Sequence, residues 1–151
     1  MILVIALGNA YRADDGVGLA LARRLAEAAP AGAALELEIV EAHGVLPEHA
    51  DAIATADAVL FLDASVRGQP GEIRAGPLVP RAPRPAVLHA LTPEDVLGIA
   101  QALHGRVPPA AMITVAGRDF AFAEALSPEV EAALPEALRR ALELLETLRG
   151  G

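Results

Sequence analysis

Hydrophobic and polar positions follow two different periods along the chain, and this pattern predicts alternating strands and helices. Residues 2–7 form an unbroken apolar run rich in β-branched residues, which is typical of a strand buried on both faces. Apolar residues at Val17, Leu21 and Leu25 then recur at helical spacing. The chain therefore opens with a strand, a short polar turn and a helix.

The remaining chain continues the alternation. Further strands are predicted at 35–40, 58–62, 72–79 and 111–115, and further helices at 46–56, 92–103 and 128–148. Pro77 and Pro80 restrict the strand at 72–79 to a sheet edge. Thr92 is the expected cap of its helix, and Pro135 is expected to kink the last helix or to break its first turn. Residues 41–44 are predicted to be a turn, 81–85 a proline-rich linker and 120–126 a packed loop.

Strands that alternate with helices indicate parallel crossover connections. The chain has 151 residues, the size of one ordinary domain, and it contains no internal repeat. We therefore expect a single α/β domain over residues 1–151. Its architecture should be a three-layer α/β/α sandwich, in which a mostly parallel, twisted sheet of about five strands has helices on both faces.

Composition narrows the class of protein. Hydrophobic residues make up 54% of the chain and aromatic residues only 3%, so the core must consist mainly of Ala, Val, Leu and Ile. Without any cysteine, there is no disulfide framework, thiolate zinc site or thiol nucleophile. The net charge of −8 without a clustered basic patch argues against a nucleic-acid partner. No apolar run is long enough to cross a bilayer, and Met1 leads directly into a strand, so we expect no signal peptide, no membrane partner and a cytoplasmic protein.

Three polar residues fall at or just after predicted strand ends: Asp15, Asp63 and His89. Ligands of open α/β sheets bind beyond the carboxyl ends of the strands. Asp63 follows a buried apolar run, where a carboxylate is costly without a metal, an arginine or backbone donors as its partner. Each residue also has a structural interpretation: Asp63 as a cap of the next loop, Asp15 as a helix cap and His89 as a structural histidine.

Taken together, two carboxylates and one imidazole from three loops match the ligand number of an open metal site. This set does not select one metal, because imidazole and carboxylate bind several first-row ions. His43, in the loop after the second strand, could reach the same edge. His49 and His104 are interpreted as surface residues of helices without a functional role.

Residues 8–18, GNAYRADDGVG, resemble the N-terminal signature of the hydrogenase maturation proteases: Gly-Asn, a short variable stretch, then Asp-Asp/Glu-Gly-x-Gly. Residues 61–64, FLDA, resemble the strand-end aspartate of that family, and His89 with the residues after it resembles its histidine loop. The resemblance covers nearly the whole chain. In this family the second acidic residue of the turn, the strand-end aspartate and the loop histidine contact nickel, which implies catalytic and metal-contacting roles for Asp15, Asp63 and His89.

The resemblance implies an endopeptidase that removes a C-terminal extension from the nickel-loaded large subunit of a nickel-iron hydrogenase. Its partner would be the large-subunit precursor. The nickel belongs to this substrate and serves as the recognition signal, so no permanently bound cofactor is expected.

Two other functions stay open at this point. A dinucleotide-binding enzyme also begins with a strand, a glycine turn and a helix, but the turn lacks G-x-G-x-x-G, and Asp14 and Asp15 would repel a pyrophosphate. A noncatalytic nickel-sensing or chaperone module on the same fold would use the same residues without cleaving anything.

Overall fold

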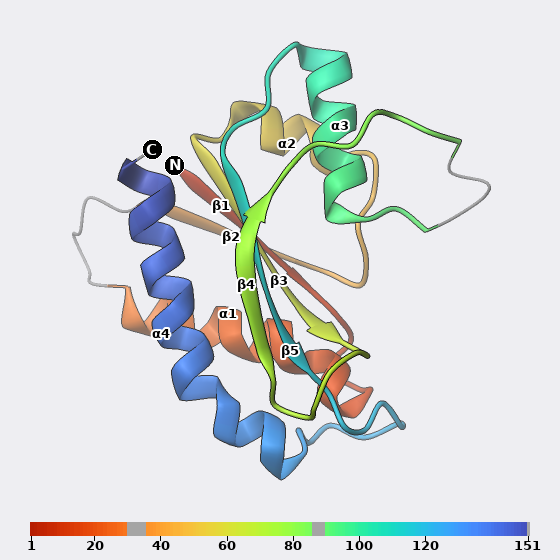
Figure 1. The fold of residues 1–151 in the computed structure, drawn as a ribbon, viewed down its shortest axis with the longest axis vertical. Coiled ribbons are helices and arrows are strands. Elements are labelled where there is room, and N and C mark those ends of the chain that lie inside the picture. Colours follow the sequence, from red (N-terminus) through yellow and green to blue (C-terminus); the bar gives the residue numbers. More distant parts are fainter. Residues whose placement is uncertain (30–35, 86–89, 151) are drawn as a thin grey trace.

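A five-stranded sheet crosses the molecule diagonally in Figure 1, with helices on both sides. The computed structural model describes residues 1–29, 36–85 and 90–150. The strand order is β2-β1-β3-β5-β4, and only β4 runs antiparallel to its neighbour. The strands are β1 (Ile2–Leu7), β2 (Leu37–Ala42), β3 (Ala58–Ser65), β4 (Ile73–Leu78) and β5 (Ala110–Ala116). The predicted mostly parallel sheet of five strands is confirmed.

The helices form the two outer layers. One face of the sheet packs against α1 (Val17–Ala28) and α4 (Pro128–Gly150), and the other packs against α2 (His49–Thr55) and α3 (Pro93–His104) (Figure 1). A single 3-10 turn, η1 (Ala13–Gly16), precedes α1. None of the helices in the described residues is long and apolar enough to span a membrane.

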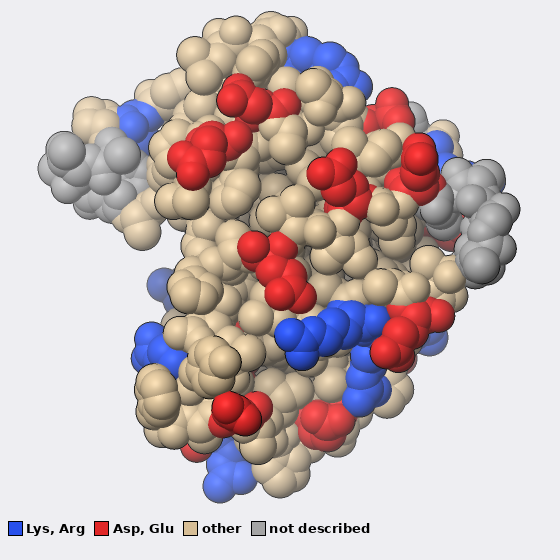
Figure 2. Space-filling view, turned by 180° about the vertical axis from the view of Figure 1, so that it is seen from behind, with Lys and Arg blue, Asp and Glu red and all other residues tan. Residues whose placement is uncertain are grey.

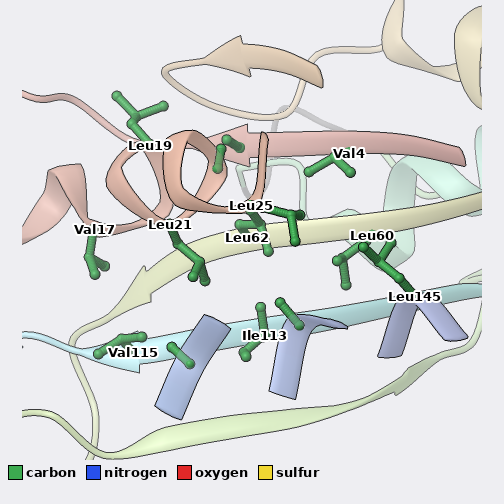
Figure 3. Packing of buried hydrophobic residues seen from close by; sticks show 14 of the residues in the cluster. Val4, Val17, Leu19, Leu21, Leu25, Leu60, Leu62, Ile113, Val115 and Leu145 are labelled. Carbon is green, nitrogen blue, oxygen red and sulfur yellow. The ribbon is translucent and has the colours of Figure 1, made fainter. Parts of the chain in front are cut away.

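Alternate residues of the central strands belong to two separate apolar clusters, one on each face of the sheet. Figure 3 shows the cluster under α1 and α4, where Val17, Leu21 and Leu25 point from α1 towards Leu60 and other strand residues. These three residues of α1 are almost completely buried, which confirms the helical stripe expected from their spacing. The opposite cluster is built around Phe61, one of the largest fully buried side chains.

Charged side chains are spread over the surface. On the face that Figure 2 shows, acidic side chains are distributed widely and the basic side chains lie among them. All 12 basic residues are arginines, and most of those in the described residues pair with a carboxylate, as Arg24 does with Glu131 at 2.9 Å. This face therefore offers no continuous basic surface for a nucleic acid.

Two strands and a helix differ in their bounds from the prediction. β2 extends to Ala42, so Glu41 and Ala42 belong to a strand and not to a turn. β3 continues to Ser65 because Asp63, Ala64 and Ser65 pair with β5. Asp63 therefore lies within the last three residues of the strand and not after it. The predicted helix at 46–56 forms only from His49 to Thr55.

The last helix continues through Pro135, so the predicted break of its first turn is wrong, while the alternative prediction of a kink stays a prediction. α4 is assigned as one element of 23 residues. Pro135 lies on its exposed side, so the Glu131 carbonyl that has lost its donor faces solvent. The buried stripe on the opposite side keeps the helix on the sheet; it comprises Val130, Leu134, Ala137, Ala141 and Leu145.

The edge strand and the third helix agree with the prediction. β4 lies at the end of the sheet, next to β5, as its prolines require. α3 begins with a capping box, in which the Thr92 side chain accepts a hydrogen bond from the Asp95 N–H and the Asp95 carboxylate accepts one from the Thr92 N–H.

The start of α1 lies in direct contact with the ends of two strands. A Cβ atom on Gly18 would lie 2.7 Å from both the Leu7 and the Leu62 carbonyl oxygens. Only a glycine lets the helix backbone come this close to β1 and β3. This contact sets the position of the turn before α1 relative to the end of β3.

Replacing Gly18 by alanine should therefore destabilise the protein, although alanine is the better helix former. Because backbone atoms of two strands must move, we expect a net loss of about 1–3 kcal/mol in the free energy of unfolding, measured by chemical denaturation. Gly44→Ala is the matched control, since nothing lies within 4 Å of the position that a Cβ atom would take there. Equal stability of the Gly18 variant and the wild type would contradict the close contact.

Candidate active site

The turn between β1 and η1 is held by close contacts and hydrogen bonds among its own residues. Gly8 has a φ of 140°, and a Cβ atom there would lie 2.0 Å from the Asp15 carbonyl oxygen. The Asn9 N–H donates to Asp15 Oδ2 at 2.9 Å, and the Tyr11 N–H donates to Asn9 Oδ1 at 2.9 Å. Ala13 has a φ of 48°, an unfavourable left-handed conformation for a residue with a side chain. The turn therefore presents the Asp15 carboxylate in one fixed orientation.

Asp14 is completely buried and anchors a distant segment of the chain. Its carboxylate accepts hydrogen bonds from the N–H groups of Arg118, Asp119 and Ser127, at 2.8, 3.0 and 2.7 Å, and from the Ser127 hydroxyl at 2.8 Å. Burial alone would raise the pKa of Asp14, but these hydrogen bonds outweigh it and lower the pKa. The two adjacent acidic residues of the turn thus differ in role, and Asp14 is structural.

The segment at 118–127 also pairs with the turn through its backbone. The Ala13 N–H donates to the Ala123 carbonyl at 2.6 Å, and the Ala123 N–H donates to the Tyr11 carbonyl at 2.9 Å. The predicted packed loop at 120–126 is therefore confirmed, and the surface that it packs against is the turn that carries Asp15.

Asp63 lies near Asp15 because β1 and β3 are adjacent parallel strands that end at the same edge. Its Oδ1 atom accepts a hydrogen bond from the Ala64 N–H at 2.8 Å. Burial, together with repulsion from the Asp15 carboxylate, raises the pKa of Asp63 to about 6, although the Ala64 hydrogen bond opposes this. Among the described residues, no arginine or histidine pairs with Asp63. The site therefore contains a desolvated carboxylate that no cationic side chain of the described residues neutralises.

Not every predicted site residue can be placed. His89 lies outside the described residues, so the predicted set of Asp15, Asp63 and His89 stays a prediction. Within the described parts of the chain, no group of three or more His, Cys, Asp or Glu residues is arranged to hold a metal ion. His43 is exposed after β2.

The other two histidines have structural contacts. His49 Nδ1 accepts a hydrogen bond from the Leu46 N–H at 2.9 Å at the start of α2. His104 Nε2 lies 2.8 Å from an Asp51 carboxylate oxygen and so links α3 to α2. Both residues lie on helices at the surface, as predicted, and their contacts are structural.

Asp95 organises the approach to α3, a role that sequence reasoning missed. Besides capping the helix, this buried carboxylate accepts hydrogen bonds from Arg84 Nε at 3.2 Å and from Arg81 at 3.4 Å. Burial opposes ionisation, but the hydrogen bonds from Thr92 and Arg84 lower the pKa of Asp95. The predicted linker at 81–85 is therefore fastened to the start of α3. The Thr-x-x-Asp spacing was the only signal in the sequence.

Large apolar side chains are exposed at the edge of the sheet that carries Asp15 and Asp63. Tyr11, Val66 and Phe122 are 57%, 80% and 88% exposed and follow β1, β3 and β5, respectively. Since these parallel strands end at one edge, the three side chains lie in the segments that leave the edge carrying Asp15 and Asp63. Exposed apolar side chains gathered in this way are typical of a surface that contacts another protein.

Comparison with known proteins identifies the fold. No model of a protein family and no curated protein sequence matches the chain. Among solved structures, the hydrogenase maturating endopeptidase HybD from E. coli matches with a TM-score of 0.75 and 23% sequence identity, over 97% of this chain and 92% of that one. This chain has the fold of the hydrogenase maturation endopeptidases.

Two archaeal structures agree with this assignment. The [NiFe] hydrogenase maturation protease HybD from Thermococcus kodakarensis gives a TM-score of 0.69 at 24% identity, over 95% of this chain and 98% of that one. The protease HycI from Thermococcus kodakarensis KOD1 gives 0.67 at 24% identity, over 98% and 92% of the two chains. The fold expected from the motif at 8–18 is thus confirmed.

Removing the charge of Asp14 should destabilise the protein. In Asp14→Asn the side-chain nitrogen replaces one accepting oxygen, so buried N–H groups of the 118–127 segment lose their acceptor. We expect a loss of roughly 2–4 kcal/mol in the free energy of unfolding at pH 7, measured by denaturant titration. Glu124→Gln removes an exposed charge from the same segment and should change stability little. Equal effects of the two substitutions would contradict the anchoring role.

Removing the charge of Asp63 should have the opposite effect, and only above mildly acidic pH. The folded-state pKa of about 6 exceeds the ordinary value of 3.8, so the folded protein retains a proton that the unfolded chain has lost. Asp63 therefore lowers stability as the pH rises from about 4 to 6. Asp63→Asn should match the wild type below pH 3.8 and be more stable above pH 6, by at most about 3 kcal/mol. A pH-independent difference would contradict this origin.

Proposed function

We propose that this protein is an endopeptidase that removes a C-terminal extension from the nickel-loaded large subunit of a nickel-iron hydrogenase. The observation that carries the proposal is the buried Asp63 carboxylate beside the like-charged Asp15, in a fold shared with hydrogenase maturation endopeptidases. The motif at 8–18 and the exposed apolar side chains in the segments after β1, β3 and β5 also support it.

Both carboxylates have an oxygen available for a cation. Asp15 Oδ2 accepts from the Asn9 N–H and Asp63 Oδ1 accepts from the Ala64 N–H, while their second oxygens have no hydrogen-bond donor among the described residues. In the proposal, these oxygens and His89 hold the nickel ion that the substrate brings. A divalent cation there would remove the repulsion between the two carboxylates, so binding favours their charged forms.

The reaction is the hydrolysis of one peptide bond near that ion. The chain has no cysteine to act as a nucleophile, and a bound metal ion supplies the activation in its place. It does so either by polarising the scissile carbonyl group or by lowering the pKa of a water molecule. The protein holds the ion through Asp15, in the turn η1 after β1, and Asp63, near the end of β3, which positions the peptide bond beside it.

Two alternative functions, a dinucleotide-binding enzyme and a noncatalytic nickel-binding module, can be compared with the proposal. A dinucleotide would place its pyrophosphate at the turn before α1, where the Asp15 carboxylate already accepts the available Asn9 N–H. A noncatalytic nickel-sensing or chaperone module would bind the same precursor and leave it intact, so a cleavage assay separates it from a protease.

The proposal predicts that Asp15→Asn and Asp63→Asn bind the nickel-loaded precursor poorly and cleave it at least about 10²-fold more slowly, since each removes a charge that holds the ion. Cleavage is measured as the mass lost by the large subunit. Asp51→Asn, which changes an exposed carboxylate on α2, is the control and should cleave at the wild-type rate.

Unchanged cleavage by Asp63→Asn would exclude Asp63 from the site. A wild-type protein that binds the precursor without cleaving it would instead support the noncatalytic module.

A further inference from the structure

A groove lies on the open face of the sheet, beside the candidate site. It has a volume of about 210 Å³ and lies along β4 and β5. Five of its residues alternate along the two strands and so share one face of the sheet, the face that α2 and α3 cover elsewhere. They are Arg74, Gly76, Leu78, Met112 and Thr114.

The register of the sheet connects this groove to Asp63. Thr114 is the ladder partner of Asp63 on one side and of Arg74 on the other. Residues opposite each other in a ladder point to the same face, so the three side chains form one row across β3, β5 and β4. Adjacent strands lie about 5 Å apart, so one end of the groove is next to the Asp63 side chain.

Gly76 leaves the middle of the groove open. It lies opposite Met112 within β4, where a glycine weakens a strand, and no atom lies within 4 Å of the position that its Cβ would take. Leu78 and Met112 are partly buried and provide apolar surface. Among the described residues that line the groove, Arg74 is the charged one; its side chain is exposed, and its Nε donates to Glu72 at 2.9 Å. The groove thus suits an extended, largely apolar polypeptide that carries acceptors towards Arg74.

We infer that this groove binds the C-terminal tail of the precursor in an extended conformation, next to the scissile peptide bond. The inference rests on the proposed protease function. A tail in the groove would run across the row of Arg74, Thr114 and Asp63, which brings its backbone to the carboxylates. The groove would thereby contribute to substrate binding and not to the chemical step.

Filling the groove tests this inference. Gly76→Leu places four carbon atoms in open space, so its melting temperature should match that of the wild type. Cleavage of the nickel-loaded precursor should show a KM raised at least about tenfold with little change in kcat, because contacts made equally in the ground and transition states are lost. Gly150→Leu is the matched control: Gly150 also has open space around its Cβ position, and it lies at the far end of α4.

Single-cysteine variants allow the groove to be filled after the protein has folded, so the result does not depend on whether a substitution impairs folding. The chain has no cysteine, so Gly76→Cys and Gly150→Cys each carry a single thiol. Each folded variant is assayed before and after modification with a bulky maleimide, with the excess reagent removed before the precursor is added. We expect modification at residue 76 alone to raise KM.

The outcomes separate the two proposals. If the wild type does not cleave the precursor, the protease function fails, and the tail-binding groove fails with it. If the wild type cleaves and both the Gly76 variants and the modified cysteine cleave equally well, only the groove is excluded. A wild-type dimer that Gly76→Leu converts to an actively cleaving monomer would assign the groove to a second copy of the chain and overturn the inference.

Discussion

The buried carboxylate of Asp14 is the contact on which the geometry of the site depends. A charge in the interior is tolerated only when hydrogen bonds replace its hydration, and Asp14 receives four, all from the segment that follows β5. The turn after the first strand and the start of the last helix are thereby fixed to each other. Asp15, the next residue, then has one possible position at the edge of the sheet.

Asp14, Asp15 and Asp63 carry the same carboxyl group, but their different surroundings give them different roles. Asp14 and Asp63 are both removed from water, but Asp14 is surrounded by donors, and Asp63 has the Ala64 N–H and a neighbouring carboxylate. Hydrogen bonding therefore favours the charged form of Asp14, and burial disfavours that of Asp63. The first pattern is that of a structural residue, and the second is typical of functional sites.

Local patterns predicted the elements whose signals are local. The apolar run of β1, the stripe of α1 and the Thr92 cap of α3 each depend on a few neighbouring residues, and all three were predicted. The end of β3 was predicted too early because Asp63 and Ala64 join the strand only through pairing with β5, a contact between distant residues. Pattern reasoning left a kink or a broken first turn open at Pro135, whereas the buried apolar stripe of α4 continues on both sides of this residue and the helix is not interrupted.

The candidate site was predictable only where its signal lies within a few residues of the sequence. A carboxylate after a buried strand identifies Asp63 from the sequence, and adjacent parallel strands bring it to Asp15. The role of Asp14 could not be found, because its donors are 104 to 113 residues away in the sequence. The groove along β4 and β5 depends on the register of these two strands, which no sequence pattern specifies.

In the view of Figure 1 both described ends of the chain lie away from the candidate site, at the side where β1 begins. There the ammonium group of Met1 pairs with Asp57. Material attached at either end would therefore project away from Asp15 and Asp63. A carrier protein or a surface tether could be joined there while the edge that carries the two carboxylates stays open to a large partner.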